Sequence, residues 1–439
     1  MATLPRSIRI KSIQYTALTL LVVSGAVNYM DRATLAVANP LIRADLGLSI
    51  ADMGLLLSAF LWAYAFAQLP AGALVDRLGP RLVLALSLGL WSVAQAAGGL
   101  VNSFRDLFIL RMILGVGEAP QFPTASRIVR DWFNVRLRGT ATGIWNCSST
   151  LGNALSAPIL TLLMLSFGWR WMFAVMGVAG LLVAIAFYTL HRNPADVPLN
   201  ADERRYLAEG DAGATERKVT WQDWRRLFSF RTTWGMIFGF FGVIYMIWLY
   251  SAWLPSYLEI DRHISIAHTG LVAAVPSLFG VAGSIVGGRF TDWLVKRGVS
   301  PMNSRKYPMA ASLTATALFT TLAAFTPSTV IAVGAISASL FLLYVAASAA
   351  WAMVPVAAPA NCTGSLGAMQ NFGGYIGGAL APTVTGFTVQ ATGSFTAAFV
   401  VGAAVALITA IGYLLIVGGE IPARDTDEVD TLVLPPSLP

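Results

Sequence analysis

Two acids and two bases stand inside otherwise apolar stretches of this chain. Asp31 and Arg32 are adjacent, and no other charged residue occurs within 12–42. Arg111 and Glu118 follow in "RMILGVGE", seven residues apart, which places them on one helical face about 10.5 Å apart along the axis. A charge at the centre of a bilayer costs roughly 2.5–3.5 kcal/mol on the insertion scale, so these four residues need partners.

Together these four side chains have the chemistry to bind an anion and to carry a proton. A guanidinium stays charged and binds carboxylates in a fork, so Arg32 and Arg111 are candidates for holding a substrate carboxylate. Burial favours the neutral form of a carboxyl group and a nearby arginine favours the charged form, so Asp31 and Glu118 are candidate proton carriers. The alternative is that the four residues are buried ion pairs that only fix helix contacts. Stability alone is a weak reason for such pairs, because apolar replacements are often neutral or stabilising.

A second group of polar and aromatic residues could contact the rest of the anion. Tyr64 and Gln68 are four residues apart and therefore share a helical face. Each member of the group could equally tie neighbouring helices together or pack between them. The group comprises Tyr29, Tyr64, Gln68, Asn146, Ser149, Trp248, Gln370, Asn371 and Tyr375.

The elements that must position these residues are membrane-spanning helices. The 439 residues are 56% hydrophobic and only 12% charged, which excludes an ordinary soluble domain. No alternation typical of a membrane β-barrel is visible. Stretches long enough to span a bilayer occur at 13–38, 51–75, 82–101, 106–127, 141–165, 170–190, 232–257, 267–290, 306–326, 328–351, 366–389 and 395–417.

The basic residues predict the orientation of these twelve spans. With the N-terminus in the cytoplasm, 23 of the 29 Lys and Arg residues fall in cytoplasmic segments. This bias has the usual sign, so we expect both termini in the cytoplasm and the protein in a bacterial inner membrane. The net charge of +7 then reflects basic loops facing an anionic lipid leaflet. Nucleic-acid binding would need an exposed basic domain, and no segment is long enough for one.

A polar segment at 191–231, with eight basic and seven acidic residues, separates six spans from six. We therefore expect an N-terminal six-helix bundle at 1–190, a cytoplasmic linker at 191–231, a C-terminal bundle at 232–418 and a disordered tail at 419–439. Within the linker, Asn200 is a possible cap for a short helix. The two cysteines have no metal-ligand spacing, and we expect no metal and no cofactor.

The two halves of the chain carry related motifs. "GALVDRLGPR" at 72–81 follows the second span and "GRFTDWLVKRG" at 288–298 follows the eighth. "NCSSTLGNALSAP" in span five is similarly matched by "NFGGYIGGALAP" in span eleven. Two matches in the same order indicate an internal repeat, which is typical of secondary transporters.

The loop between spans two and three resembles the signature loop of the major facilitator superfamily. "NYMDR", "GVGEAPQFPTASRIVRDWF" and "WLPSYL" together resemble its anion:cation symporter family, whose members carry sugar acids, phthalate-type acids, sialic acid or glutamate. The resemblance implies an all-α membrane protein with twelve transmembrane helices in two pseudo-symmetric six-helix bundles. It also implies that the arginines of spans one and four and the glutamate of span four are essential.

The charged residues at the ends of spans two and eight have a different expected role. Asp76, Arg77, Arg81 and Asp292 lie where exposure makes charge inexpensive, so they need no contact with substrate. The family resemblance implies that they form a gate, whose charge pairs and helix-end interactions stabilise the outward-facing state and break during the transport cycle. The alternative is the ordinary charge bias of cytoplasmic loops.

We therefore expect a monomeric transporter that takes up a small organic anion with protons, driven by the proton gradient across the lipid bilayer. An exchanger or facilitator without proton coupling is one alternative, and a membrane-embedded sensor is another. A membrane enzyme is disfavoured, because the three histidines lie at or beyond the ends of spans. Ser149 stands where the sugar-acid carriers are expected to have glutamine, so both a sugar acid and a phthalate-like acid stay open.

Overall fold

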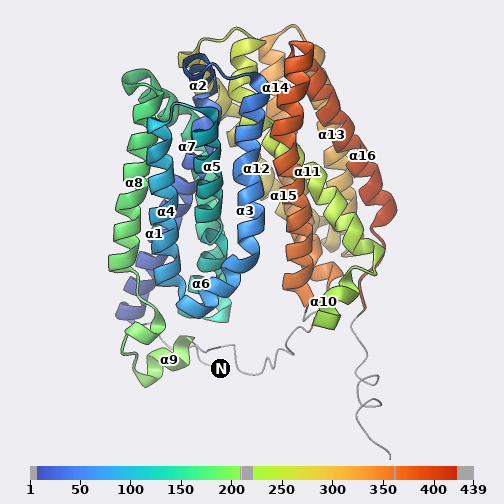
Figure 1. The fold of residues 1–439 in the computed structure, drawn as a ribbon. Coiled ribbons are helices and arrows are strands. Elements are labelled where there is room, and N and C mark those ends of the chain that lie inside the picture. The colour runs from blue at the N-terminus through green and yellow to red at the C-terminus, as the bar shows by residue number, and fades with distance from the viewer. Residues whose placement is uncertain (1–6, 208, 210–220, 360–361, 423–439) are drawn as a thin grey trace, which may run out of the picture.

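The computed structural model describes residues 7–207, 209, 221–359 and 362–422, and the regular elements within these ranges are all helices (Figure 1). A few side chains inside helices, including that of Asp76, are not described. The helices of the first half are α1 (Ile8–Val37), α2 (Asn39–Leu46), α3 (Ile50–Leu78), α4 (Pro80–Ala97), α5 (Phe104–Glu118), α6 (Gln121–Trp132), α7 (Val135–Phe167) and α8 (Trp169–Leu190).

The linker and the second half form a further eight helices in the described part of the chain. They are α9 (Ala201–Leu207), α10 (Trp221–Leu227), α11 (Arg231–Ile260), α12 (Ile266–Lys296), α13 (Asn303–Phe325), α14 (Thr329–Ala357), α15 (Thr363–Thr392) and α16 (Phe395–Ile416). Short 3₁₀ turns lie at Gly98–Leu100 and Pro194–Asp196. The predicted bundle boundaries remain predictions, and most of the predicted tail lies outside the described residues.

Ten of the described helices are long and apolar enough to cross a membrane. The two other expected spans correspond to α15, which is rich in Gly and Thr, and to α5 followed by α6. Leucine and isoleucine side chains on the outer faces of α8, α13 and α16 are exposed, as lipid contact requires. The chain is thus a multi-pass integral membrane protein.

The fourth expected span is broken immediately after Glu118. Helix α5 ends at that residue and α6 begins at Gln121, with Pro120 between them. A proline has no N–H to donate to the preceding turn, and its ring clashes with that turn, so an uninterrupted helix is disfavoured here. The break leaves Glu118 at the end of a helix inside the protein.

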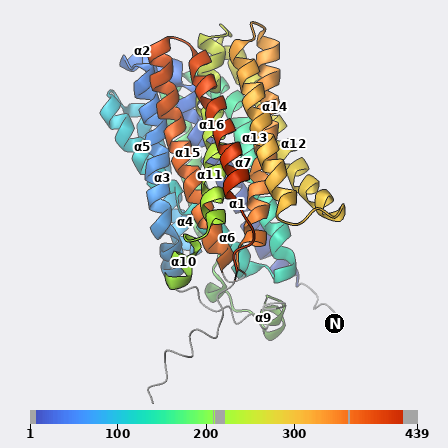
Figure 2. The same ribbon diagram turned by 90° about the vertical axis from the view of Figure 1, so that its right-hand side faces the viewer.

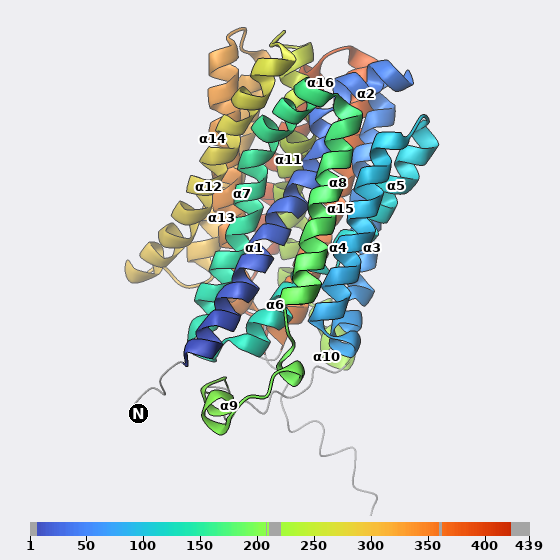
Figure 3. The same ribbon diagram turned by 90° about the vertical axis from the view of Figure 1, so that its left-hand side faces the viewer.

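The two halves repeat one packing pattern. In the first half α1 packs along α7, α3 along α5 and α4 along α8, and in the second half α11 packs along α15, α12 along α14 and α13 along α16. Figure 3 shows α1, α7 and α8 side by side, and Figure 2 shows α15 next to α16. The related motifs of spans five and eleven each contribute a glycine at which a neighbouring helix approaches closely. A Cβ at Gly152 would lie 2.6 Å from Tyr29 of α1, and a Cβ at Gly377 would lie 2.4 Å from the backbone of Phe241 in α11.

The halves are joined most closely at the end of the molecule where α2 lies, opposite α9 and α10 (Figure 1). There α3 meets α15 and α7 meets α12. Thr383 donates from its backbone N–H to Ser58 Oγ at 3.1 Å, and Ala51 donates likewise to Gln390 Oε1 at 2.9 Å. A Cβ at Gly54 would lie 2.7 Å from the carbonyl oxygen of Pro382. By contrast, a Cβ at Gly72, near the other end of α3, would meet no atom within 4 Å.

The expected short helix in the linker is confirmed as α9. Asn200 caps it, because its Oδ1 accepts from the backbone N–H of Glu203 at 2.8 Å while Glu203 Oε2 accepts from the backbone N–H of Asn200 at 3.1 Å. The helix is also docked on the first half: Ser7 Oγ donates to Glu203 Oε1 at 2.9 Å, and Tyr206 is buried.

Candidate functional site

Arg32 and Glu118 form an ion pair between α1 and the end of α5. Arg32 Nε donates to Glu118 Oε2 at 2.7 Å, and the two side chains are only 7% and 0% exposed. Arg32 Nη2 and Glu118 Oε1 have no hydrogen-bond partner among the described residues. Each member of the pair thus keeps one position at which a ligand or water could bind.

Asp31 and Arg111 are buried near this pair and interact with it electrostatically. Asp31 is fully buried, and neither of its carboxyl oxygens has a hydrogen-bond partner within the described ranges. Arg111 is 3% exposed. Its Nε and Nη1 also have no hydrogen-bond partner within the described ranges. An unpaired charge in a buried site is strongly destabilising, so this arrangement is suited to receive an anion at Arg111 and a proton at Asp31.

Aromatic rings surround the two guanidinium groups. The Arg32 guanidinium carbon lies 4.9 Å from the ring centroid of Tyr29 and 4.8 Å from that of Tyr64. Phe60 of α3 lies between the two arginines, with its centroid 5.1 Å from each guanidinium carbon. These distances are within the range of cation–π attraction, which holds the arginines in place without neutralising them.

The second half of the chain meets this site with aromatic side chains. The ring of Tyr375 in α15 lies 4.9 Å from that of Tyr64, and Trp248 of α11 lies 6.4 Å from Phe60. Asn371, one turn before Tyr375 on α15, is half-buried. Gln370 is fully buried, and neither atom of its amide is hydrogen-bonded within the described residues. The structure thus brings Tyr29, Tyr64 and Tyr375 together near Arg32, and it places Trp248 next to Phe60.

Three other predicted residues lie at the margin of this cluster. Ser149 is half-buried on α7, lies near the Tyr29 hydroxyl and donates to the backbone carbonyl of Asn146 at 2.8 Å. The Asn146 side chain is exposed on the same helix. Gln68 is half-buried one turn beyond Tyr64 on α3. The roles of all three stay predictions.

Sequence reasoning missed several neighbours of the four charges. Phe60 is the clearest case, and its position four residues before Tyr64 put it on the same face of α3. Asn28 lies beside Glu118 and is four residues before Arg32, so the same spacing could have identified it. Trp91 of α4 lies near Asp31, and Tyr344 of α14 lies near Tyr29; no sequence signal indicated either contact.

The predicted gate residues lie at the end where α9 and α10 are found, and the partners of Arg81 and Asp292 lie in the loop after α8 and in the second half, respectively. Arg81 Nη1 pairs with Asp196 Oδ2 at 3.6 Å, and Arg305 Nη2 pairs with Asp292 Oδ1 at 3.7 Å. Arg77 is exposed, while the side chain of Asp76 lies outside the described residues. No hydrogen bond or ion pair in the described part of the chain links Arg77, Arg81 or Asp292 across the two halves.

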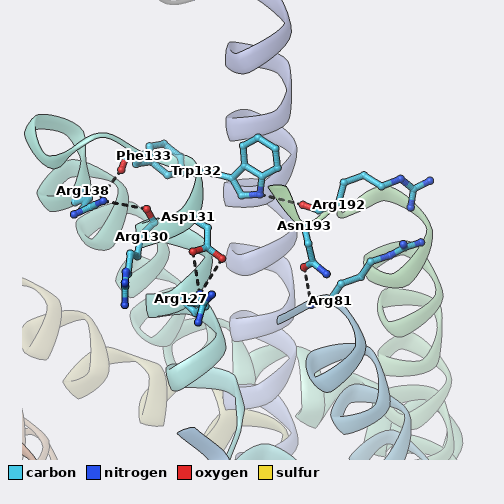
Figure 4. A network of polar contacts seen from close by, with 9 residues as sticks. All are labelled: Arg81, Arg127, Arg130, Asp131, Trp132, Phe133, Arg138, Arg192 and Asn193. Carbon is cyan, nitrogen blue, oxygen red and sulfur yellow. Dashed lines mark hydrogen bonds and ion pairs between the residues drawn. The ribbon is translucent and has the colours of Figure 1, made fainter. Parts of the chain in front are cut away.

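A network around Trp132 ties this end of the first half together (Figure 4). Trp132 Nε1 donates to the carbonyl of Arg192 at 3.0 Å, and the backbone N–H of Arg81 donates to Asn193 Oδ1 at 3.4 Å. On α6, Arg127 pairs with Asp131 at 2.9 Å. The loop after α8 is thereby fastened to the ends of α4 and α6.

His191, at the start of that loop, is buried and its ring stacks on Phe187 with 5.0 Å between centroids. Burial, reinforced by Arg81, lowers the pKa of His191 to about 4, so the imidazole is neutral near pH 7. Across the described residues, His, Cys, Asp and Glu form no cluster of three that could hold a metal ion. The expectation of no cofactor stays a prediction.

The sequence is similar to a family model and to individual proteins that all belong to membrane transporters. Residues 21–382 match the sequence model of the Major Facilitator Superfamily. The chain is 44% identical over 422 residues to the "Probable L-galactonate transporter" of Escherichia coli K12, covering 96% of this chain and 93% of the relative. It is 34% identical over 424 residues to the "Probable galactarate/D-glucarate transporter" of the same strain, covering 92% and 95%.

Among solved structures, the fold is similar to that of a bacterial homologue of the human lysosomal transporter Spinster in an inward-facing, unoccupied conformation. The TM-score is 0.73 at 19% sequence identity, and the match covers 94% of this chain and 96% of the other. At this identity the match supports the fold alone.

Proposed function

Because this chain belongs to the Major Facilitator Superfamily and is a membrane transporter rather than an enzyme, we propose that it takes up a sugar acid together with protons. The cycle would be alternating access, in which two six-helix bundles expose one central site to each side of the membrane in turn.

The observation that carries this proposal is the buried cluster of two acids and two bases. Arg32 is paired with Glu118, whereas Arg111 has guanidinium nitrogens without a partner among the described residues. A carboxylate that enters the site can pair with Arg111 and compete with Glu118 for Arg32. Substrate arrival would then change the partners of both buried carboxyl groups.

Proton coupling follows from the charge of this cluster. Two arginines and two carboxylates are neutral together, so an added anion leaves an uncompensated charge inside the membrane. Protonation of Asp31 or Glu118 would restore neutrality. We propose Asp31 as the first acceptor, because it is fully buried and neither oxygen is hydrogen-bonded within the described ranges.

The relatives favour a sugar acid as the substrate. The two reported above are named for L-galactonate and for galactarate and D-glucarate. They span more than nine-tenths of this chain, and both names are those of carboxylates with several hydroxyl groups. We therefore propose a sugar acid, rather than a phthalate-like acid, as the substrate.

We further propose that the protein acts as a monomer in a bacterial inner membrane, with both termini in the cytoplasm. In that orientation the halves are joined at the periplasmic side, around Ser58 and Thr383. Asp292 and Arg81 would exchange their present partners for contacts between the halves when the cytoplasmic side closes. The same change would involve Asp76 and Arg77.

Reconstitution into proteoliposomes tests the proposal. With an imposed proton gradient, we expect the wild type to accumulate L-galactonate. Glu118→Gln should lose this accumulation but retain exchange of internal for external substrate, because the arginines remain. Glu420→Gln, the same substitution at an exposed residue, is the matched control.

Several outcomes would contradict the proposal. Undiminished proton-driven accumulation by Glu118→Gln would remove the role of Glu118. Exchange without accumulation by the wild type would favour an exchanger without proton coupling. Binding without any flux would favour a sensor.

A further inference from the structure

We propose that the site takes sugar acids with one carboxylate, the aldonates, and discriminates against those with a carboxylate at both ends, the aldarates. This inference rests on the proposed function, and it concerns the second end of the substrate, which the arginine cluster does not reach.

The cations of the site all belong to the first half of the chain. Arg32 and Arg111 lie on α1 and α5, and Arg32 already has an ionic partner in Glu118. Arg111 has no ion-pair partner within the described ranges. The site therefore offers one unpaired guanidinium, which is enough to bind one carboxylate.

In the second half of the chain, α14, α15 and α16 carry no charged residue, and the charges of α11, α12 and α13 lie within about two turns of a helix end. Segments 232–258 and 307–419 contain no charged residue and no histidine at all. The cations of the intervening segments lie at helix ends: Arg262, for example, is bound at the end of α11 to the Tyr257 hydroxyl at 2.6 Å. Within the described ranges, no cation of this half forms a hydrogen bond, ion pair or cation–π contact with Tyr375, Trp248 or Asn371.

Neutral side chains face the arginines instead. Tyr375 and Trp248 contact Tyr64 and Phe60, the rings that cover the guanidinium groups. Asn371 shares the face of Tyr375 on α15, one turn away. Such rings can cover the C–H groups of a sugar chain, and an amide can hydrogen-bond hydroxyl groups. A carboxylate in this position would lose its hydration without gaining a cation.

Charge balance gives the same preference. One proton taken up at Asp31 or Glu118 neutralises the cluster with a bound monoanion, whereas a dianion would need two protons. An aldarate would therefore bind with a residual negative charge unless both buried acids were protonated together.

Galactonate and galactarate form a matched pair for the test, because they differ only in CH₂OH or carboxylate at one end. Uptake of labelled L-galactonate into proteoliposomes is competed with unlabelled L-galactonate or galactarate, and D-gluconate and D-glucarate form a second pair. We expect each aldarate to need at least about a tenfold higher concentration than its aldonate for half-inhibition.

A charge-gain variant tests the cause of the discrimination. Asn371→Lys places an ammonium group on the neutral side of the site, and we expect it to shift the half-inhibition ratio towards the aldarate by roughly tenfold. Asn371→Gln lengthens the side chain without charge and should not produce this shift. Thermal unfolding of each variant checks that it is folded.

The failures are distinguishable. Equal competition by galactonate and galactarate in the wild type would overturn the inference but leave the proposed transport of sugar acids standing. Competition by neither acid, with no labelled uptake, would overturn both. A shift with Asn371→Gln equal to that with Asn371→Lys would show that charge is not the cause.

Discussion

Arg32 Nε and Glu118 Oε2 lie 2.7 Å apart and join α1 to the last residue of α5, with both side chains buried. The pair sits beside Pro120, where the fourth span is broken. A bound anion that displaces Glu118 from Arg32 therefore acts at a point where the helix is already interrupted. In the proposed cycle, substrate binding, proton uptake and helix movement would be linked at this one contact.

The Arg32–Glu118 pair predicts different outcomes for stability and transport. Arg32→Met strands a buried carboxylate and should lower the free energy of unfolding by about 3–5 kcal/mol. The double variant Arg32→Met/Glu118→Leu removes both charges and should regain most of that stability in detergent, measured by thermal unfolding. It should still show no uptake, because one of the two arginines proposed to hold the carboxylate and one of the two proposed proton carriers are gone. Uptake by the double variant would mean that the pair is only structural.

Phe60 should contribute to anion binding through the two arginines. Its ring lies 5.1 Å from both guanidinium carbons, and loss of a cation–π contact costs about 0.5–2 kcal/mol. We expect Phe60→Leu to raise the Kd for L-galactonate by about 2- to 30-fold. Phe60→Tyr, which keeps the ring, is the control. Equal affinities of the Leu variant and the wild type, measured by calorimetry, would argue against this role.

The contact at Gly54 should be necessary for one half of the transport cycle. A side chain there would enter the space occupied by the Pro382 carbonyl, 2.7 Å from the position of its Cβ. We expect Gly54→Leu to prevent the halves from closing at this end and to reduce uptake to background. Gly334→Leu is the control, because a Cβ at Gly334 meets no atom within 4 Å. Wild-type uptake by Gly54→Leu would show that this end need not close so tightly.

Docking of α9 should depend on pH through Glu203. A backbone hydrogen bond from Asn200, followed by one from the Ser7 hydroxyl, lowers the pKa of Glu203 below its ordinary value of 4.5. Because the folded pKa is the lower one, this stabilisation is complete above about pH 4.5 and is lost as the pH falls through the folded value.

Hydrogen exchange of α9 measures this effect. Glu203→Gln should exchange faster than the wild type at pH 7, and the difference should shrink at about pH 3, after correction for intrinsic exchange rates. Asp202→Asn, a neighbouring acid on the same helix, is the control. An equal difference between Glu203→Gln and wild type at both pH values would contradict the predicted dependence on ionisation.

The fold was largely predictable because hydropathy acts locally. Each apolar stretch must form a helix to satisfy its backbone in lipid, so the spans could be read one by one. The repeat between Gly152 and Gly377 likewise predicted two related halves, since both glycines allow one helix to pack closely on another. The sequence shows a proline at position 120, which can break a helix. Only the structure shows that the helix ends at Glu118 and leaves this residue at a helix end inside the protein.

The sequence by itself determined which charges are buried, because Asp31, Arg32, Arg111 and Glu118 are embedded in apolar segments that can only lie in the membrane. Only the tertiary structure decided that Glu118 pairs with Arg32 and that Arg111 keeps unbonded nitrogens. The physical reason is distance along the chain: Arg32 and Glu118 are 86 residues apart, and their contact depends on how α1 packs against α5. Helical periodicity orders residues on one helix and carries no information about which helix lies opposite.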